Sequence, residues 1–246
     1  MKIVILTARG VGGATIFGAL LGLIFKKTTE RRTNATLAFA AGVMLAAAMI
    51  GLIFPAIEHG GKYGVITATI GIFIGALSVN LLDMLLPCFF PFSLRDGDNS
   101  GLRSVLLFVG AIAMHNLPEG IAAGVGFGTG EIGDAILIAT AVALQNIPEG
   151  MIVFLAMLGS GMKPGRTFLI AAMTGVVEIV GTFIGYFTVS LSAAVLPFAL
   201  AFAGGTMLYV ISDELIPDIH SREAGHFATY FLLIGFTFML IFDAII

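Results

Sequence analysis

The 246-residue chain has few charged side chains. They make up 11% of the sequence, whereas 58% of the residues are hydrophobic. An ordinary soluble domain has roughly 25% charged residues. So few charges cannot cover the surface of a soluble protein of this length, and we therefore exclude a soluble enzyme, a nucleic-acid-binding protein and a disordered chain. The mean hydropathy of +1.06 indicates instead a protein that crosses a membrane several times.

The sequence also lacks tryptophan, and it has one cysteine, Cys88, which excludes an internal disulfide. It contains no phosphate-binding loop of the P-loop type, and no stretch of chain is left over for a nucleotide-binding domain. The net charge of −3 is weak and suggests no polyanionic partner. We therefore expect no cofactor, no nucleotide partner and no nucleic-acid partner.

Eight apolar segments are each long enough for a helix that crosses the roughly 30 Å hydrocarbon core of a bilayer. Short loops with charges, glycines or prolines separate them. Nothing is left for a second domain, so we expect residues 1–246 to form one all-α, polytopic transmembrane domain. The segments are 7–25, 34–57, 64–90, 102–128, 132–158, 166–190, 194–217 and 226–246.

Lysine and arginine are distributed unevenly between the two sides of such a protein. Nine of the 12 lie on the side of the loops that follow the first, third, fifth and seventh segments, and three lie on the side of the termini. Because basic residues favour the cytoplasmic side, we expect both termini to lie outside the cytoplasm. The expected location is the plasma membrane, which in a bacterium is the inner membrane.

Two similar motifs, 30 residues apart, place polar side chains in the middle of the fourth and fifth segments. Glu119 and Glu149 are their acids, and Glu178 lies at the midpoint of the sixth segment. A carboxylate at the bilayer centre costs about 2.5–3.5 kcal/mol on insertion scales. No Lys or Arg lies at comparable depth in segments two to eight, so the acids need protonation, a water-filled cavity or a bound cation. The motifs read MHNLPEG (114–120) and LQNIPEG (144–150).

The spacing within each motif favours the cation. Two polar side chains lie three and four residues before each glutamate and therefore share its helix face. Each motif proline also frees a backbone carbonyl, because it has no N–H to donate. Imidazole, carboxylate, amide and thioether groups suit Zn²⁺, Fe²⁺ or Mn²⁺ better than Mg²⁺ or Ca²⁺. The candidate metal-binding residues are Met44, His115, Asn116, Glu119, Gln145, Asn146, Glu149 and Glu178.

Two of these candidates have an equally simple structural interpretation. Met44, taken alone, is typical of a residue that fills an apolar core. His115, taken alone, is typical of a side chain that makes a hydrogen bond between two transmembrane helices. The duplication of the motif and the third acid at matching depth are what favour an ion site.

The paired motifs resemble the signature of the ZIP (Zrt-, Irt-like) family of divalent-metal transporters. The stretch AGVMLAA (41–47) and the glutamate of the sixth segment also match, and Gln145 resembles the bacterial GufA-like branch. The resemblance implies eight transmembrane helices, with inverted three-helix repeats (segments one to three and six to eight) around segments four and five. It implies that the substrate is zinc, or also iron, manganese or cadmium, and that the metal moves into the cytoplasm by alternating access.

The resemblance also divides the candidate ligands between two adjoining sites at the midplane, which together would hold one or two ions. Glu119 and Glu149 would be shared by both sites. Some relatives carry Asp where this chain has Asn146, and the neutral amide lowers the negative charge of the second site. The primary site would contain Met44, His115, Glu119, Gln145 and Glu149, and the second would add Asn116, Asn146 and Glu178.

Polar residues at the ends of two segments are candidates for metal entry and release. Glu58 and His59 follow the second segment on the expected outer side. A second cluster follows the seventh segment on the expected inner side and resembles the release path of the family. Both clusters are also what solvated helix ends would contain. The inner candidates are Asp213, Glu214, Asp218 and His220.

Two other functions are compatible with a midplane metal site. A metal-permeable channel would use the same residues as a carrier. A membrane-embedded metal-dependent hydrolase would be expected to carry H-E-x-x-H, whereas this chain has H-x-x-x-E and no serine nucleophile with a base at that depth. We therefore expect no catalytic residue. The expected partners are divalent metal ions and the lipid bilayer, and a homodimer is left open.

Overall fold

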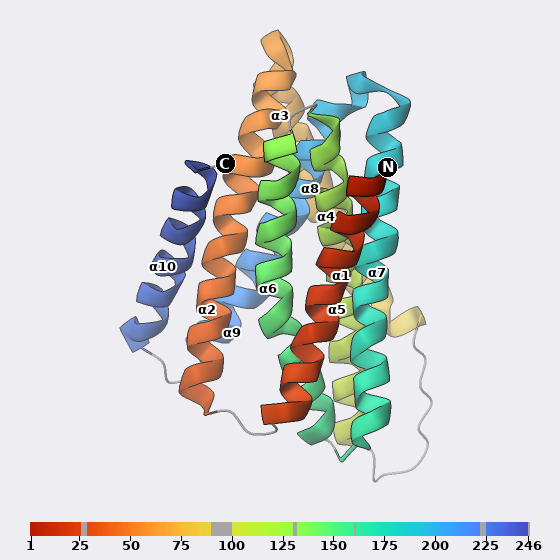
Figure 1. Cartoon of the computed structure of the whole chain (residues 1–246), viewed down its shortest axis with the longest axis vertical. Helices are drawn as coiled ribbons and strands as arrows, with labels where there is room; N and C mark the ends of the chain where they lie inside the picture. The colour runs from red at the N-terminus through yellow and green to blue at the C-terminus, as the bar shows by residue number, and fades with distance from the viewer. Residues whose placement is uncertain (26–28, 90–99, 130–131, 160, 222–224, 246) are drawn as a thin grey trace.

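The structure, a computed structural model, describes residues 1–25, 29–89, 100–129, 132–159, 161–221 and 225–245. Successive long helices run in opposite directions, and both termini lie at the same end of the molecule (Figure 1). The α-helices are α1 (Lys2–Phe25), α2 (Glu30–Ala46), α3 (Phe54–His59), α4 (Gly64–Phe89), α5 (Ser100–Val125), α6 (Ile132–Gly159), α7 (Pro164–Leu191), α8 (Leu196–Val210), α9 (Ile216–Ser221) and α10 (Gly225–Asp243).

Seven helical stretches of the described residues are long and apolar enough to cross a membrane. The predicted segments match the observed helices closely, since segment 64–90 corresponds to α4 and segment 132–158 to α6. The predicted segment 102–128 corresponds to α5, a helix of 26 residues that is not among the seven. The prediction of an all-helical, polytopic membrane protein is therefore confirmed at this level.

Local sequence explains where several helices begin. Prolines lie in the first turn of α3, α7 and α8, at Pro55, Pro164 and Pro197. Proline is tolerated there because the first N–H groups of a helix have no partner within it. Thr29 caps α2, and its hydroxyl oxygen accepts a hydrogen bond from the backbone N–H of Arg32 at 3.4 Å.

Two membrane-length helices contain a π-helical segment that the sequence analysis did not predict. The first π-segment, Ala47–Ile53, joins α2 to α3, and the second π-segment, Ile211–Leu215, joins α8 to α9. In each case a short helix with an early proline follows, Pro55 in α3 and Pro217 in α9. The second and seventh predicted segments therefore share the same order of helix types.

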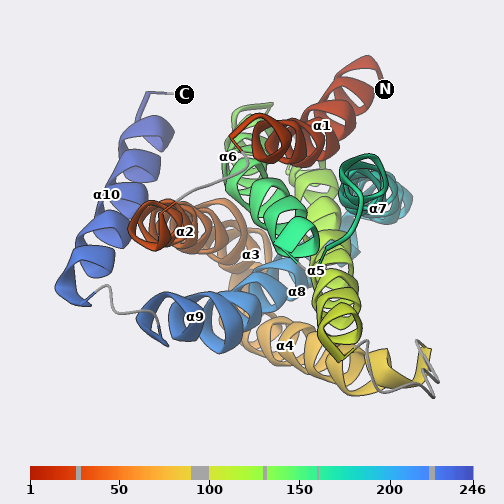
Figure 2. The ribbon, with the colours of Figure 1, turned by 90° about the horizontal axis from the view of Figure 1, so that it is seen from below.

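The helices form two groups. The first helix group contains α1, α5, α6 and α7, and the second contains α2, α3, α4, α8, α9 and α10. The most extensive contacts lie within these groups, between α5 and α7, α1 and α6, α4 and α8, and α2 and α10. Seen along the helices, the two groups lie side by side (Figure 2). They meet where α2 and the first π-segment contact α6 and where α5 contacts α8.

Glycines bring the helices of the first helix group close together. A Cβ atom at Gly120 of α5 would overlap the backbone oxygen of Glu178 on α7. A Cβ atom at Gly150 of α6 would overlap the backbone oxygen of Thr15 on α1. Small residues allow this approach of backbones in membrane helices. Both glycines belong to the duplicated motif, so the motif sets helix packing as well as polar chemistry.

In the second helix group a glycine also brings two backbones close together, whereas a glycine at the boundary between the groups faces a side chain. A Cβ atom at Gly42 of α2 would overlap the backbone oxygen of Leu232 on α10. At the boundary, Gly51 of the first π-segment faces the side chain of Ile138 on α6, and a Cβ there would lie 2.8 Å from its Cγ1 atom. At Gly42 backbone therefore meets backbone, whereas at Gly51 a side chain of the other group meets the backbone.

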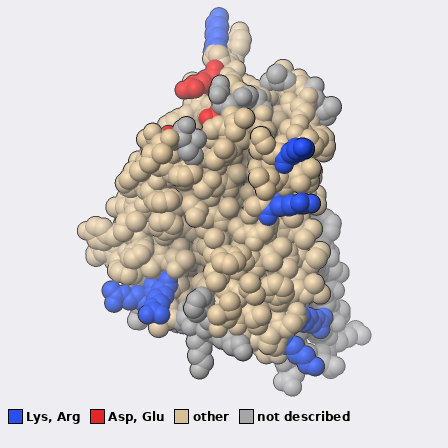
Figure 3. All heavy atoms as spheres, viewed as in Figure 1, with Lys and Arg blue, Asp and Glu red and all other residues tan. Residues whose placement is uncertain are grey.

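The outer surface is largely apolar. In the space-filling view, acidic and basic side chains lie mainly toward the ends of the molecule, and most of the middle carries neither (Figure 3). Large hydrophobic side chains such as Phe73, Leu169 and Tyr230 are more than half exposed. A surface of this kind fits the hydrocarbon region of a bilayer.

Candidate metal site

Glu178 is a fully buried acid near the middle of α7, with 0% of its surface exposed. Its Oε1 atom accepts hydrogen bonds from Thr15 Oγ1 of α1 at 2.6 Å and from Asn116 Nδ2 of α5 at 2.5 Å. Its Oε2 atom accepts a hydrogen bond from Asn146 Nδ2 of α6 at 2.5 Å. The four helices of the first helix group therefore meet at one carboxylate.

The duplicated motif explains this convergence. In each motif the glycine follows the asparagine by four residues, so the two share a helix face. Gly120 lets the backbone of α7 approach α5 at Glu178, and Asn116 on the same face of α5 reaches the carboxylate. Gly150 does the same between α6 and α1, where Thr15 approaches. The glycines thus bring the donors and the acid into contact.

Each of the two motif asparagines has one polar side-chain atom that makes a hydrogen bond to Glu178 and one that makes no hydrogen bond among the described residues. Asn116 and Asn146 are both fully buried, and their Nδ2 atoms face Glu178. The Nδ2 atom of Asn146 also donates to the backbone oxygen of Val11 at 3.3 Å. The Oδ1 atoms of both asparagines are buried, and neither has a hydrogen-bond partner among the described residues. An unsatisfied buried acceptor costs about 1–3 kcal/mol, and a cation is one way to satisfy it.

The other motif side chains lie within three residues of the two asparagines along the chain. Gln145 is 2% exposed, and neither its Nε2 nor its Oε1 atom has a hydrogen-bond partner in the described part of the chain. Glu119 is also buried, whereas Glu149 is partly exposed and interacts electrostatically with Glu178. Both α5 and α6 therefore bury polar motif side chains inside the first helix group.

Met44 belongs to the second helix group and lies in the apolar core. It is 2% exposed and is part of a buried cluster that includes Val43, Leu52, Val142 and Met207. Leu144 of the second motif packs against the same cluster. Nothing in these contacts directs its sulfur toward Glu178, so its role as a ligand stays a prediction.

The described residues do not form an ion cage of the most familiar type. Within the described ranges, no group of three or more His, Cys, Asp or Glu side chains could hold a metal ion. Amide and hydroxyl groups supply the hydrogen bonds to Glu178. The side chain of His115, which α5 carries, lies outside the described residues. The predicted ligand set as a whole therefore stays a prediction.

The predicted entry and release residues lie far along the chain from the motifs. Glu58 and His59 are exposed at the end of α3, at the same end of the molecule as the termini (Figure 1). Asp213 is exposed in the second π-segment. The side chains of the other inner candidates lie outside the described residues; they are Glu214, Asp218 and His220.

Sequence analysis missed Thr15, which the structure places against Glu178. Threonine is common in transmembrane helices because its hydroxyl can donate to a carbonyl of its own helix. Thr174 does so to Ala171 at 2.8 Å, and Thr182 does so to the backbone oxygen of Glu178 at 2.9 Å. A threonine that reaches another helix looks the same in the sequence, so no signal could have distinguished Thr15.

Asn34 is a second buried polar residue without a predicted role. It is 1% exposed at the start of α2, and its Nδ2 atom donates to the backbone oxygen of Ile219 on α9 at 3.1 Å. Its Oδ1 atom has no hydrogen-bond partner in the ranges that the structure describes. A polar residue at the edge of an apolar segment reads as a helix start, and the long-range contact to α9 cannot be read from the sequence.

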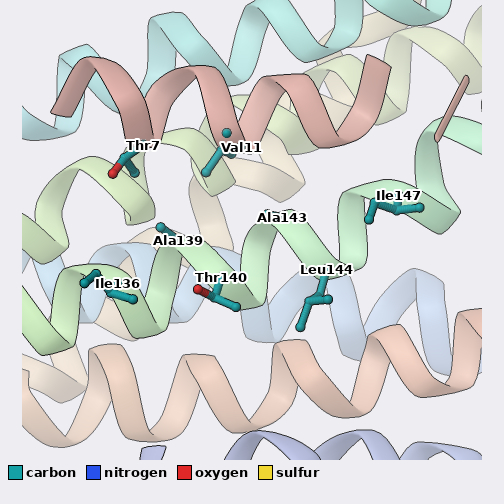
Figure 4. A pocket seen from close by; sticks show the side chains of 9 residues that line it. Thr7, Val11, Ile136, Ala139, Thr140, Ala143, Leu144 and Ile147 are labelled. Carbon is teal, nitrogen blue, oxygen red and sulfur yellow. The ribbon is translucent and has the colours of Figure 1, made fainter. Parts of the chain in front are cut away.

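A pocket of about 320 Å³ lies between α1 and α6 (Figure 4). Most of its lining is apolar, with Val11, Ala139 and Ile147 among the residues, and its polar members are Thr7 and Thr140. It adjoins the buried polar cluster through Val11, whose backbone oxygen accepts the hydrogen bond from Asn146. A cavity therefore lies next to the site on the side of α1.

The fold and these residues define a polytopic helical membrane protein with a polar centre buried in one group of its helices. Comparisons with known proteins go further. The family model described as "ZIP Zinc transporter" matches residues 92–243. "Zinc transporter GufA" of Myxococcus xanthus is 36% identical over 241 residues, which cover 94% of each chain.

Two further relatives are similar over the same share of this chain. "Zinc transporter ZIPB" of Bordetella bronchiseptica is 34% identical over 237 residues, which cover 94% of this chain and 77% of that protein. "Zinc transporter ZIP11" of Homo sapiens is 30% identical over an alignment of 319 residues, which covers 94% of this chain and 93% of that protein. The chain belongs to the ZIP family. The family consists of transporters rather than enzymes, which confirms both the resemblance and the prediction that this chain is not an enzyme.

Proposed function

We propose that this protein carries divalent transition-metal ions, zinc above all, across the plasma membrane into the cytoplasm. The observation that carries the proposal is the set of buried polar atoms in the middle of the first helix group. Gln145 has two such atoms without partners among the described residues, and Asn116 and Asn146 have one each. Each costs about 1–3 kcal/mol when left unsatisfied. A bound cation offsets that cost at the three amide oxygens, because an oxygen can coordinate a cation whereas the Nε2 group of Gln145 cannot. The relatives are named as zinc transporters.

The proposed ion site is the one predicted from the motifs. Imidazole and carboxylate groups, joined by an amide and a thioether, give the mixed nitrogen, oxygen and sulfur donors that suit zinc, and also iron, manganese and cadmium. One or two ions would bind. The primary site comprises Met44, His115, Glu119, Gln145 and Glu149, and the adjoining residues are Asn116, Asn146 and Glu178.

We propose further that residues 1–246 form a single transporter domain with eight transmembrane helices. Inverted repeats of segments one to three and six to eight would relate α2 and α3 to α8 and α9. The support is that both spans contain a π-helical segment followed by a short helix with an early proline. Alternating access would then open the midplane site to each side in turn. One chain suffices for this cycle, whether or not two chains associate.

The orientation in the bilayer is also part of the proposal. Arg31 and Arg32 begin α2, and Lys163 and Arg166 lie at the start of α7, all at the end of the bundle away from the termini. Basic residues favour the cytoplasmic side. We place this end in the cytoplasm and both termini outside. Glu58 and His59 would then meet incoming metal, and the inner candidates at Asp213–His220 would release it.

The test is zinc uptake into liposomes that contain the purified protein and a trapped zinc indicator. We expect saturable uptake, and His115→Ala should reduce it to the level of protein-free liposomes. Equal insertion of the variant, measured by the amount of protein in floated liposomes, is the control. Uptake by His115→Ala at the rate of the unmodified protein would contradict the proposed site.

A metal-permeable channel is the second candidate, because it would use the same residues. Counterflow separates the two functions. Liposomes loaded with unlabelled zinc should accumulate radioactive zinc transiently above its external concentration if the protein is a carrier. A channel would only equilibrate the label. Uptake that rises linearly with zinc concentration and shows no counterflow would therefore replace the carrier with the channel.

A further inference from the structure

The hydrogen bonds to Glu178 leave it little capacity to bind a metal ion. A carboxylate has about four acceptor positions, and three side-chain donors already occupy three of them, from Thr15, Asn116 and Asn146. The three donor–acceptor distances are 2.5–2.6 Å. An ion that bound Glu178 would have to displace donors that come from three different helices.

The amide at position 146 allows the hydrogen bonds around Glu178 to form without a cation. Its Nδ2 atom donates to Glu178 and to the backbone oxygen of Val11. An aspartate at this position would have no N–H to donate, and it would place a negative charge directly beside Glu178, in addition to that of Glu149. Two adjacent carboxylates require a cation or a proton between them. Asn146 removes that requirement, because it supplies the donor itself.

The same hydrogen bonds fix where the two amide oxygens point. An amide group is planar, so an Nδ2 atom that faces Glu178 turns its Oδ1 atom away from that carboxylate. The Oδ1 atoms of Asn116 and Asn146 are the ones that lack partners among the described residues. Each lies on a helix that carries a motif glutamate three residues later, Glu119 or Glu149. Glu178 therefore orients both amides while leaving their oxygens available.

We propose that Glu178 is a positioning residue, that Thr15 holds it in place, and that this chain consequently binds a single metal ion. The ion lies in the primary site, and hydrogen bonds take the place of a second ion at Glu178. This inference rests on the proposed function, because it divides the proposed ligands into residues that bind the ion and residues that orient them. It assigns a role to Thr15, which lies outside both motifs.

The first experiment counts zinc ions per chain by equilibrium dialysis of the purified protein against radioactive zinc. We expect one ion for the unmodified protein and one ion, bound more weakly, for Glu178→Gln. If Glu178 were an ion ligand, the unmodified protein would bind two ions and Glu178→Gln would bind one. Two ions in the unmodified protein would overturn the inference.

The Asn146→Asp variant tests whether the amide at position 146 is what excludes a second ion. It removes the donor to Glu178 and adds a carboxylate, so we expect the count to rise from one ion to two. A count that stays at one in a folded Asn146→Asp protein would show that the amide is not what excludes the second ion. That result would overturn the inference while leaving zinc transport untouched.

The second experiment tests Thr15 with three variants. Thr15→Val keeps the shape and removes the hydroxyl, and we expect zinc affinity to fall about tenfold, as for other residues that orient metal ligands. Thr15→Ser keeps the hydroxyl and should restore the affinity. Thr7→Val is the matched control on the same helix, since Thr7 lines the pocket and does not contact Glu178. Its zinc affinity should be unchanged.

The readouts separate this inference from simpler outcomes. If Thr15 only stabilises packing, Thr15→Val lowers the melting temperature without changing the dissociation constant for zinc, which would contradict a positioning role. If the unmodified protein neither binds nor transports zinc, the proposed function itself fails. If it transports zinc and binds two ions, only the inference about Glu178 and Thr15 fails.

Discussion

The two helix groups are packed alike but bury different side chains. In the first helix group every helix contributes buried polar residues, among them Thr15, Asn116, Gln145 and Glu178. In the second group the buried polar residues of the described part of the chain are confined to α2 and α8; they are Thr33, Asn34 and Thr206. Polar groups at depth in a membrane are costly and mark functional sites. The difference supports the proposal that the buried acids and amides of the ion site belong to the first helix group, whereas the second group would contribute Met44 and an otherwise apolar core.

Helix packing does not account for this difference. Both groups use glycines to bring backbones together, at Gly150 against Thr15 in the first and at Gly205 against Ile72 in the second. A requirement for tight packing is therefore met without buried acids or amides. The comparison predicts that changes to packing will destabilise either group, whereas changes to buried polar side chains will lower transport more in the first group than in the second.

Removal of a motif acid should have the largest effect. In Glu119→Ala the first helix group loses a buried carboxylate from the proposed primary site. We expect a loss of zinc uptake on the order of 100-fold, as for removal of an important group near a metal. The measurement is the initial rate of zinc uptake into proteoliposomes with matched protein content. A rate within twofold of the unmodified protein would end the assignment of ion chemistry to this group.

A matched pair of asparagine variants compares the two groups directly. Asn116 donates to Glu178 in the first helix group, and Asn80 of α4 donates its Nδ2 atom to Tyr209 of α8 at 2.8 Å in the second. We expect Asn116→Ala to lower kcat/KM for zinc about tenfold, and Asn80→Ala to leave it nearly unchanged. Equal losses in the two variants would remove the functional distinction between the groups.

Glycine variants should affect the stability of both groups to a similar extent. Gly150→Ala and Gly205→Ala each place a methyl group against a backbone oxygen of the neighbouring helix. We expect each to lower the melting temperature in detergent by about 5 °C, from an overpacking cost of about 1–3 kcal/mol. Gly13→Ala is the control, because no atom lies within 4 Å of a Cβ at that position. A control that melts as low as the two variants would contradict this explanation.

The smallest expected effect concerns the hydroxyl of Tyr209. Tyr209→Phe removes the acceptor of the hydrogen bond from Asn80 in the second helix group. Such bonds between membrane helices are worth about 0.6 kcal/mol on average, so the melting temperature should fall by about 1–2 °C. Zinc uptake should not change, since the pair lies outside the first helix group. A clear loss of uptake would mean that the pair of Asn80 and Tyr209 takes part in transport.

The sequence predicts the positions of the helices well because membrane thickness imposes a length on each apolar segment. The predicted segment 166–190 matches α7 within two residues at its start and one at its end. The π-segments could not be predicted in the same way. The first, Ala47–Ile53, consists of ordinary apolar residues, whereas the second also contains Ser212, Asp213 and Glu214. In both, the wider backbone turn depends on what packs around it.

The candidate site could be predicted in part. The duplicated motif identified Asn116 and Asn146, and the depth of Glu178 in its segment suggested that it would lie near them. The sequence could not show that both asparagines donate to Glu178, because helix rotation and tilt decide which atoms meet. Thr15 had no distinguishing signal, since its partner is 163 residues away.

The π-segment between α2 and α3 changes the angular positions, around the helix axis, of the side chains that follow it. An α-helix turns by about 100° per residue, and a π-helical turn takes in an additional residue. A helical wheel drawn continuously from Thr33 to His59 therefore assigns side chains beyond Ile53 to the wrong sector. Accessibility scanning by introduced cysteines needs one wheel for α2 and a separate one for α3, with the offset measured rather than counted.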